Sequence, residues 1–189
     1  MAGIFKSYDV RGVVPTQLTT GEAYRIGKAA AAYLKAKTLA VGRDARIHSP
    51  EMSAALSAGI NAAGCHVLDL GMGPTPLGYF AAGSLGKAKV GGAIQVTASH
   101  NPAEYNGFKF TKANAEPMSY DSGLNEIEKL FLRDQPTLAR RRGTCKELDL
   151  RAAYIQHCLR FAKLDRRRPL KVAIDTGNGV MGALLPDLL

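Results

Sequence analysis

Short apolar runs alternate along the chain with longer segments whose apolar residues recur at helical spacing. The apolar runs lie at residues 39–41, 66–70, 90–96 and 107–110, and their length and bounding turn residues are typical of buried strands. Helices are expected at residues 19–37, 49–63, from 75 onward, and 122–133. This alternation predicts an α/β domain in three layers, with helices on both faces of a mainly parallel mixed sheet.

Three of the expected helices begin with recognisable start sequences. Thr19 and Glu22 have the spacing of a capping box, in which each side chain bonds the other residue's backbone amide. Ser49 is followed by Pro50 and a glutamate, so we expect Ser49 to cap a helix that has proline in its first turn. Thr75 precedes a proline in the same way and predicts a shorter helix.

A second unit begins near residue 146. The stretch 133–146 contains a proline, three consecutive arginines and a glycine, which is typical of a linker. A helix is expected over 149–164, then a strand over 170–175, a glycine turn at 176–179 and the start of another helix. Such a unit needs further strands to bury its faces. We therefore expect residues 1–145 to form one domain and residues 146–189 to be the incomplete beginning of a second, similar domain.

The chain carries a net charge of +9, from 25 basic and 16 acidic residues. A charge of this sign attracts nucleic acids, anionic membranes or small phosphorylated molecules. The densest arginine clusters, at 140–142 and 166–168, have no interleaved aromatic residues and no helix-turn-helix or zinc pattern beside them. A solvated surface is therefore favoured over nucleic-acid binding.

Several features indicate a cytoplasmic protein that binds no membrane. No apolar run is long enough to span a bilayer, and the first residues lack the charged start and apolar core of a signal peptide. The three cysteines, Cys65, Cys145 and Cys158, lack metal-ligand spacing, and their odd number indicates reduced thiols.

The loop after the expected strand at 90–96 concentrates polar chemistry. It has the sequence Thr-Ala-Ser-His-Asn-Pro at 97–102, and ligands of open α/β sheets bind beyond the carboxyl ends of strands. Ser99 has two candidate helpers. One is His100, whose adjacency can turn its ring away from the hydroxyl, and the other is Lys109, which can return on the next strand. A turn with only structural hydrogen bonds is an equally good interpretation of these residues alone.

Further motifs accompany that loop in a fixed order. They are FKSYDVRG at 5–12, VGRDAR at 41–46 with Ser49-Pro50 after it, GPTP at 73–76, YNGFK at 105–109 and AIDTGNG at 173–179. Together with the loop at 97–102, this series resembles the α-D-phosphohexomutases, the family of phosphoglucomutases, phosphomannomutases and phosphoglucosamine mutases. The resemblance covers the whole chain, and its last motif resembles the start of that family's second domain.

The resemblance implies that Ser99 is a phosphoserine that donates a phosphoryl group to the sugar and regains one. One oxygen of its phosphate would coordinate Mg²⁺, the implied cofactor. The family's metal loop has three closely spaced aspartates in a later domain, and this sequence has no such cluster. We therefore expect a fragment of a four-domain enzyme. It would lack the C-terminal domains that complete the site and would have little or no mutase activity alone.

The resemblance implies further roles, residue by residue. His100 would belong to the catalytic group and, with Asn101, would shape the loop and contact phosphate or substrate. Arg11 and Lys109 would lie beside the reacting hydroxyl as acid–base or electrostatic groups that also bind substrate, and Tyr8 would line the same pocket. Phosphoryl transfer depends on positioning and on neutralising phosphate charge, which suits arginine and lysine.

Arg43 and Asp44 have two interpretations. The resemblance implies that they form a supporting shell around the site. A simple surface ion pair between the two neighbours at a strand end is equally consistent with the sequence.

The implied reaction converts a hexose 1-phosphate to the 6-phosphate through a hexose bisphosphate. The Tyr-Asp that precedes Val10, Arg11 and Gly12 resembles the phosphomannomutase/phosphoglucomutase branch, which favours mannose or glucose phosphate over a phosphoglucosamine mutase. Two other interpretations are a non-catalytic protein that binds a sugar phosphate or another subunit, and an unrelated serine hydrolase. The lack of a Gly-x-Ser-x-Gly motif counts against the hydrolase.

Overall fold

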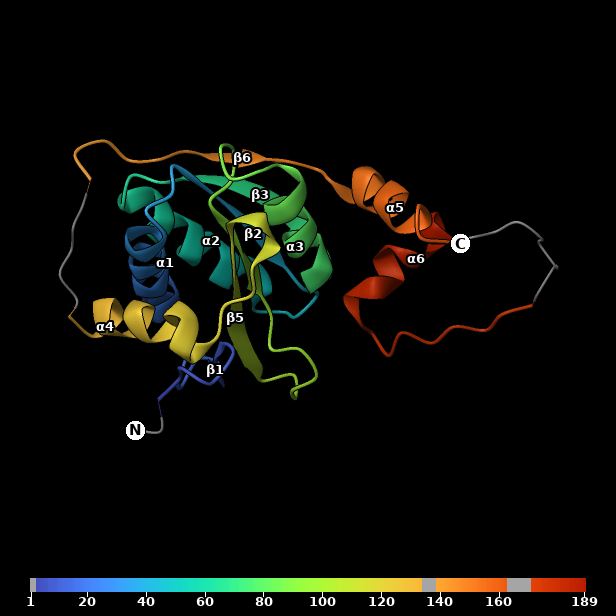
Figure 1. Ribbon diagram of the computed structural model, residues 1–189. Coiled ribbons are helices and arrows are strands. Elements are labelled where there is room, and N and C mark those ends of the chain that lie inside the picture. Colours follow the sequence, from blue (N-terminus) through green and yellow to red (C-terminus); the bar gives the residue numbers. More distant parts are fainter. Residues whose placement is uncertain (1–2, 134–138, 163–170) are drawn as a thin grey trace.

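A six-stranded sheet forms the centre of the computed structural model, which describes residues 3–133, 139–162 and 171–189 (Figure 1). The strands are β1 (Val10–Val13), β2 (Thr38–Arg43), β3 (His66–Met72), β4 (Gly92–Val96), β5 (Tyr105–Lys112) and β6 (Cys145–Glu147), and their order across the sheet is β1-β5-β4-β2-β3-β6. The β4-β2-β3-β6 pairs are parallel, whereas β5 runs antiparallel to both β4 and β1. The mainly parallel mixed sheet that the sequence predicts is confirmed.

Helices cover both faces of this sheet. On one face, α1 (Thr20–Leu34), α2 (Ser49–Ala62) and α4 (Asn125–Arg133) enclose the larger apolar core, and on the other face α3 (Thr75–Ser84) encloses a smaller one (Figure 1). Short turns of helix, η1 (Ala113–Ala115) and η2 (Tyr120–Leu124), connect β5 to α4. The three-layer α/β/α architecture is therefore also confirmed.

Helices α1 and α2 cross at two glycines that have no room for a side chain. A Cβ added to Gly27 would lie 2.2 Å from the carbonyl oxygen of Leu56, and a Cβ added to Gly59 would lie 2.0 Å from that of Tyr24. Real Cβ atoms do not approach backbone oxygens so closely, so both positions require glycine for the backbones to touch. This contact holds α2, and with it the loop before α2, close against α1.

The predicted capping box at the start of α1 is confirmed. The hydroxyl of Thr19 accepts hydrogen bonds from two amide groups of the first turn, and the carboxylate of Glu22 accepts one from the Thr19 amide at 3.0 Å. The side chain of Thr19 also bonds the Glu22 carboxylate directly, and this hydrogen bond lowers the pKa of Glu22. The helix therefore begins where the sequence predicts.

The predicted caps of the next two helices are wrong. Ser49 is the first residue of α2 and His48 is its N-cap, because the Ser49 hydroxyl donates instead to Asp44 at 2.5 Å. Thr75 is likewise the first residue of α3, and Pro74 is the N-cap. At α2 a carboxylate in the preceding loop, five residues earlier, accepts from the hydroxyl that the sequence pattern assigned to the helix amides.

The expected linker contributes to the first domain. Within its described part, the amide of Ala139 bonds the carbonyl of Ala62, and the amide of Gly143 bonds that of Asn61. The chain then forms β6, which pairs in parallel with β3 and extends the sheet past residue 145. The sequence did not predict β6 because this strand has only three residues, all of them exposed and without an apolar run. Strand β1, which also lacks an apolar run, was not predicted either.

The strand expected over 170–175 is not present in its described part. Residues 171–175 have no ladder partner among the described residues, and Val172 and Ile174 are exposed. A strand needs a neighbour for its backbone amides and carbonyls. The expected helix over 149–164 is shorter as described, at α5 (Arg151–Leu159), and η3 (Val180–Ala183) and α6 (Leu185–Leu188) follow the glycine turn.

Across the described ranges, the helices are all too short or too polar to cross a membrane.

Candidate functional site

Ser99 lies in a tight turn just beyond the carboxyl end of β4. Its φ angle is 56°, in the left-handed region, which costs a residue with a Cβ about 1–2 kcal/mol. The surrounding hydrogen bonds stabilise this conformation. The Ser99 amide donates to the hydroxyl of Thr97 at 3.0 Å, and the Asn101 amide donates to the carbonyl of Ala98 at 3.1 Å. The loop therefore holds the serine in a conformation that a residue with a Cβ adopts only at a cost.

His100 turns its ring toward the serine rather than away from it. Its Nδ1 atom lies 3.3 Å from the Ser99 hydroxyl oxygen. No carboxylate in the described parts of the chain hydrogen-bonds this imidazole, so the third member of a hydrolase triad is not seen there. The pair can exchange a proton but does not form the orienting chain of a serine hydrolase.

Asp44 organises the base of the serine turn. Its two carboxylate oxygens accept from the hydroxyl of Thr97 at 2.7 Å and from that of Ser49 at 2.5 Å. The Ser49 oxygen in turn accepts from the buried amide of Asn106 on β5, at 3.1 Å. Three elements thus meet at one carboxylate, which also pairs with Arg46 at 3.2 Å. Asp44 therefore connects the turn that carries Ser99 to the start of α2.

A second cluster joins the loop between β4 and β5, residues 97–104, to the β1 edge of the sheet; we call this loop the serine loop. Arg11 donates to the side-chain oxygen of Asn101 at 2.5 Å and to the carboxylate of Asp9 at 2.5 Å. Lys109, on the neighbouring strand β5, donates to the same Asp9 oxygen at 3.0 Å. The Asp9 side chain is only 6% exposed, whereas Arg11 and Lys109 are 21% and 24% exposed. The buried carboxylate of Asp9 thus pairs with two cations, Arg11 and Lys109, that are both partly exposed to solvent.

A cavity of about 1120 Å³ opens beside the serine turn. The serine loop and the end of β2 form one side, and the glycine turn at 176–179 forms the other. Its lining residues are Asp44, Ala45, Arg46, Ile47, Pro74, Thr75, Pro76, Thr97, Ser99, His100, Asn101, Ala103, and Thr176 through Met181. The site residues predicted from the sequence that line it are Ser99, His100 and Asn101.

Arg11 and Lys109 do not line the cavity themselves. Arg11 is connected to it by its hydrogen bond to Asn101, and Lys109 is connected to Arg11 through Asp9. Tyr8 is not brought to the cavity. It is largely exposed and lines a separate hollow with Lys6, Tyr120 and neighbouring residues.

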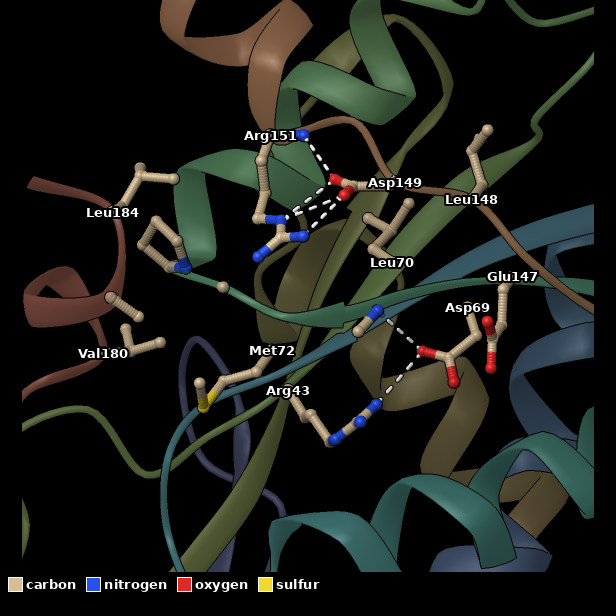
Figure 2. Close-up of a pocket in the computed structure, with 14 residues that line it drawn as sticks. Arg43, Asp69, Leu70, Met72, Glu147, Leu148, Asp149, Arg151, Val180 and Leu184 are labelled. Atoms are coloured by element: carbon tan, nitrogen blue, oxygen red, sulfur yellow. Dashed lines mark hydrogen bonds and ion pairs between the residues drawn. The ribbon is translucent and has the colours of Figure 1, made fainter. Parts of the chain in front are cut away.

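Arg43 and Asp44 do not pair with each other, so the prediction of a surface ion pair between them is wrong. Arg43 points to the other side of the strand end and pairs with Asp69 at 3.2 Å, in a smaller cavity of about 330 Å³ (Figure 2). In the same cavity Arg151 holds Asp149 by several hydrogen bonds, which lower the pKa of that carboxyl to about 2. With both arginines paired to aspartates, this cavity offers no free cation from either side chain.

Asp9 and Arg46 are site residues that the sequence did not single out. Both stood inside quoted motifs, but no local pattern shows that Asp9 is buried between two cations or that Arg46 reaches the serine loop. The described ranges also contain no group of three histidine, cysteine, aspartate or glutamate side chains arranged to hold a metal ion.

Residues 2–137 match the family profile described as phosphoglucomutase/phosphomannomutase, alpha/beta/alpha domain I. The chain belongs to this family. It is 41% identical over 183 residues to a phosphomannomutase of Salmonella montevideo and 40% identical over 183 residues to one of Escherichia coli K12, in each case over 96% of this chain.

The chain spans about 40% of the length of these curated relatives. Among solved structures, a phosphoglucomutase/phosphomannomutase family protein from Burkholderia thailandensis superposes with a TM-score of 0.86 at 37% sequence identity. That match covers 98% of this chain and 41% of the other. The fold of the described domain is therefore that of domain I of the phosphoglucomutase/phosphomannomutase family.

Proposed function

We propose that this chain is the phosphoserine-bearing part of a phosphohexomutase that interconverts hexose 1-phosphate and hexose 6-phosphate through a bisphosphorylated sugar. Residues 1–145 would be its first domain and residues 146–189 the beginning of its second, with β6 extending the first sheet slightly past that boundary. The remaining domains of the same enzyme would be its partners in catalysis. The hexose would be mannose, in line with the names of the relatives, or glucose, which the description of the family profile also includes.

The observation that carries this proposal is the placement of Ser99. It is on a strained turn at the edge of a cavity, and the resemblance of the motif at 97–102 implies that it is the family's phosphoserine. Left-handed backbone also occurs at other residues with a Cβ, such as Lys35 and Asn114, so the strain at Ser99 supports the proposal together with the cavity and the motif rather than by itself. The strain is understandable if it presents a nucleophile to the cavity.

The proposed step is a phosphoryl transfer between Ser99 and a hexose bisphosphate. The bond from phosphorus to the sugar oxygen breaks and a bond from phosphorus to Ser99 Oγ forms. The seryl proton leaves and the departing sugar oxygen gains one, so charge and atoms balance. In the reverse transfer, phosphorylated Ser99 gives its phosphoryl group to the free 6-hydroxyl of a hexose 1-phosphate and forms the bisphosphate. When that bisphosphate then returns the phosphoryl group from its 1-oxygen to Ser99, hexose 6-phosphate is left.

The surrounding side chains suit this transfer. His100, at 3.3 Å from the hydroxyl, is in place to accept or return its proton. Arg11 and Lys109 supply positive charge at the β1 edge of the loop, where Asn101 connects them to it. Phosphoryl transfer is accelerated mainly by positioning and by charge neutralisation of this kind.

Mg²⁺ is proposed for the whole enzyme, where it would neutralise phosphate charge, with the Ser99 phosphate as one ligand. The described residues do not fit a magnesium site by themselves, because they lack a suitable group of carboxylates. Among the described lining residues the one carboxylate is that of Asp44, and it is already bonded by Thr97, Ser49 and Arg46. We therefore assign no step of the transfer to the metal.

Intact mass measurement tests the assignment of Ser99. The purified chain is incubated with glucose 1,6-bisphosphate or mannose 1,6-bisphosphate, and its intact mass is compared with that of the untreated chain. Peptide mapping of the treated chain then locates the added group. We expect one added phosphoryl group, mapped to Ser99 and abolished by Ser99→Ala. The exposed Ser84 of α3 provides a matched control, since Ser84→Ala should leave the modification unchanged. A phosphoryl group on another residue, or none on the wild type, would contradict the proposal.

Turnover is tested separately with a hexose 1-phosphate and a trace of bisphosphate activator. We expect little or no hexose 6-phosphate from the chain of 189 residues. A slow single transfer to Ser99 can accumulate over a long incubation, whereas repeated turnover also needs the metal and sugar contacts that the resemblance assigns to later domains. Rapid turnover by this chain would refute that expectation while leaving the role of Ser99 intact.

A further inference from the structure

Arg46 is the side chain that makes most contacts to the serine loop. Its guanidinium donates to four backbone carbonyls in that loop and at the first residue of β5: those of Ser99 at 3.1 Å, Asn101 at 2.6 Å, Pro102 at 2.6 Å and Tyr105 at 3.0 Å. These four acceptors span the loop from the serine to the first residue of β5. One planar group therefore bonds both halves of the loop at once.

The orientation of Arg46 is itself fixed. Its Nε atom lies 3.2 Å from Asp44, and its backbone amide donates to the same carboxylate at 3.1 Å. Asp44 in turn accepts a hydrogen bond from the hydroxyl of Thr97, and that hydroxyl accepts one from the amide of Ser99. The Arg46 side chain is only 14% exposed. The guanidinium is thus held on one edge by a carboxylate and uses its other edge to hold the loop.

We propose that Arg46 is a positioning residue for the phosphoryl transfer. It holds the backbone of the serine loop so that Ser99 keeps its left-handed conformation and presents its hydroxyl to the cavity. This role rests on the function proposed for Ser99 as far as catalysis is concerned. The mechanical part, the restraint of the loop, does not depend on that function.

The geometry requires an arginine rather than any cation. A guanidinium presents five N–H donors in a rigid plane, whereas the ammonium of lysine has three donors around one point. Four carbonyls and a carboxylate lie around Arg46, and an ammonium cannot reach them together. Arg46→Lys should therefore keep the charge and lose most of the restraint, which separates geometry from electrostatics.

Arg43 provides a matched control. It is the last residue of β2, three residues before Arg46, and its guanidinium also pairs with an aspartate at 3.2 Å. That aspartate is Asp69 on β3 (Figure 2), and β3 pairs with β2 on the side opposite β4, the strand that the serine loop follows. Arg43→Lys and Arg43→Gln repeat the chemical changes made at Arg46 without touching the loop.

Hydrogen exchange measured by mass spectrometry tests the restraint directly. Hydrogen bonds to a charged donor contribute enough that losing several should raise the exchange rate of amides at 99–105 at least about tenfold. We expect this increase in Arg46→Lys and Arg46→Gln and not in the two Arg43 variants. Added guanidinium ion should slow the exchange again in Arg46→Ala. Equal exchange in the Arg46 variants and the wild type would overturn the proposal.

The rate of Ser99 phosphorylation by a hexose bisphosphate tests the positioning. A small misplacement of reacting atoms lowers a rate about a hundredfold. We therefore expect Arg46→Lys to lower the saturating rate by about that factor, while the bisphosphate concentration for half-maximal rate changes less than about threefold. An unchanged rate beside faster exchange would overturn the catalytic part of the proposal.

The two proposals fail in different ways. If the wild type takes up no phosphate on Ser99, the proposed function fails, and the exchange data still decide whether Arg46 restrains the loop. If the wild type is phosphorylated and Arg46→Lys matches it in both measurements, the role of Arg46 fails alone.

Discussion

Replacing Asp9 by asparagine removes the negative charge that Arg11 and Lys109 share. Asparagine has nearly the same volume and keeps one oxygen as an acceptor, so the change leaves no cavity and isolates the electrostatic effect. Arg11 and Lys109 are then two like charges around a neutral group. The structure predicts a clear loss of stability, because Asp9 is almost fully buried and both contacts are short, at 2.5 and 3.0 Å.

The size of the loss follows from opposing effects. Each attraction between unit charges about 4 Å apart is worth roughly 4 kcal/mol at an effective dielectric constant near 20. Most of that is offset, because burying the carboxylate costs several kcal/mol. Breaking a fully buried pair typically costs about 3–5 kcal/mol. Since Arg11 and Lys109 are about a quarter exposed and can turn toward water, we expect about 2–3 kcal/mol.

Urea denaturation followed by circular dichroism measures this loss, as a decrease of roughly 1–2 M in the midpoint. Glu116→Gln is the matched control, since Glu116 pairs with Lys112 at the other end of β5 at 2.7 Å but is 61% exposed. That exposed pair should contribute less than about 1 kcal/mol. If Asp9→Asn costs no more than Glu116→Gln, the view of Asp9 as the anion that holds the two cations in place is wrong.

Two further predictions concern the packing of the domain. Gly59→Ala should destabilise the chain by about 2 kcal/mol, because its Cβ would lie 2.0 Å from the Tyr24 carbonyl and the overpacking outweighs the gain in helix propensity. Gly83→Ala in α3, whose Cβ would meet only ordinary contacts, should cost nothing; equal effects in thermal melts would refute the close crossing. Cys65 should resist alkylation by iodoacetamide, because burial raises its pKa to about 11 and leaves about a hundredfold less thiolate below pH 9 than the usual thiol pKa of 9.0 does. Labelling of Cys65 should become fast only at a higher pH than labelling of the exposed Cys145 does. Equal labelling rates of the two cysteines at pH 8, measured by peptide mapping, would contradict this.

The sequence predicted the fold well where local patterns agree with tertiary packing. The strands β2, β3 and β4 are apolar runs because both faces of the sheet are covered, and α1 carries its own capping box. The edge strands β1 and β6 were missed because an edge needs no apolar run. The exposed segment 171–175 was wrongly predicted as a strand, because an apolar pattern says nothing about whether a pairing partner is present.

The site was predicted unevenly for a related reason. Ser99, His100 and Asn101 are adjacent in sequence and in space, so a motif identifies them together. Asp9 and Arg46 act on residues that are distant in the chain: Asp9 on Lys109, and Arg46 on carbonyls 53 to 59 positions away. Backbone carbonyls are the same at every residue, so no residue type at the acceptor end marks such a partner. A side chain that supports a loop by binding its backbone can therefore be identified only from the folded structure, where the two segments are in contact. Arg46 supports the serine loop in this way.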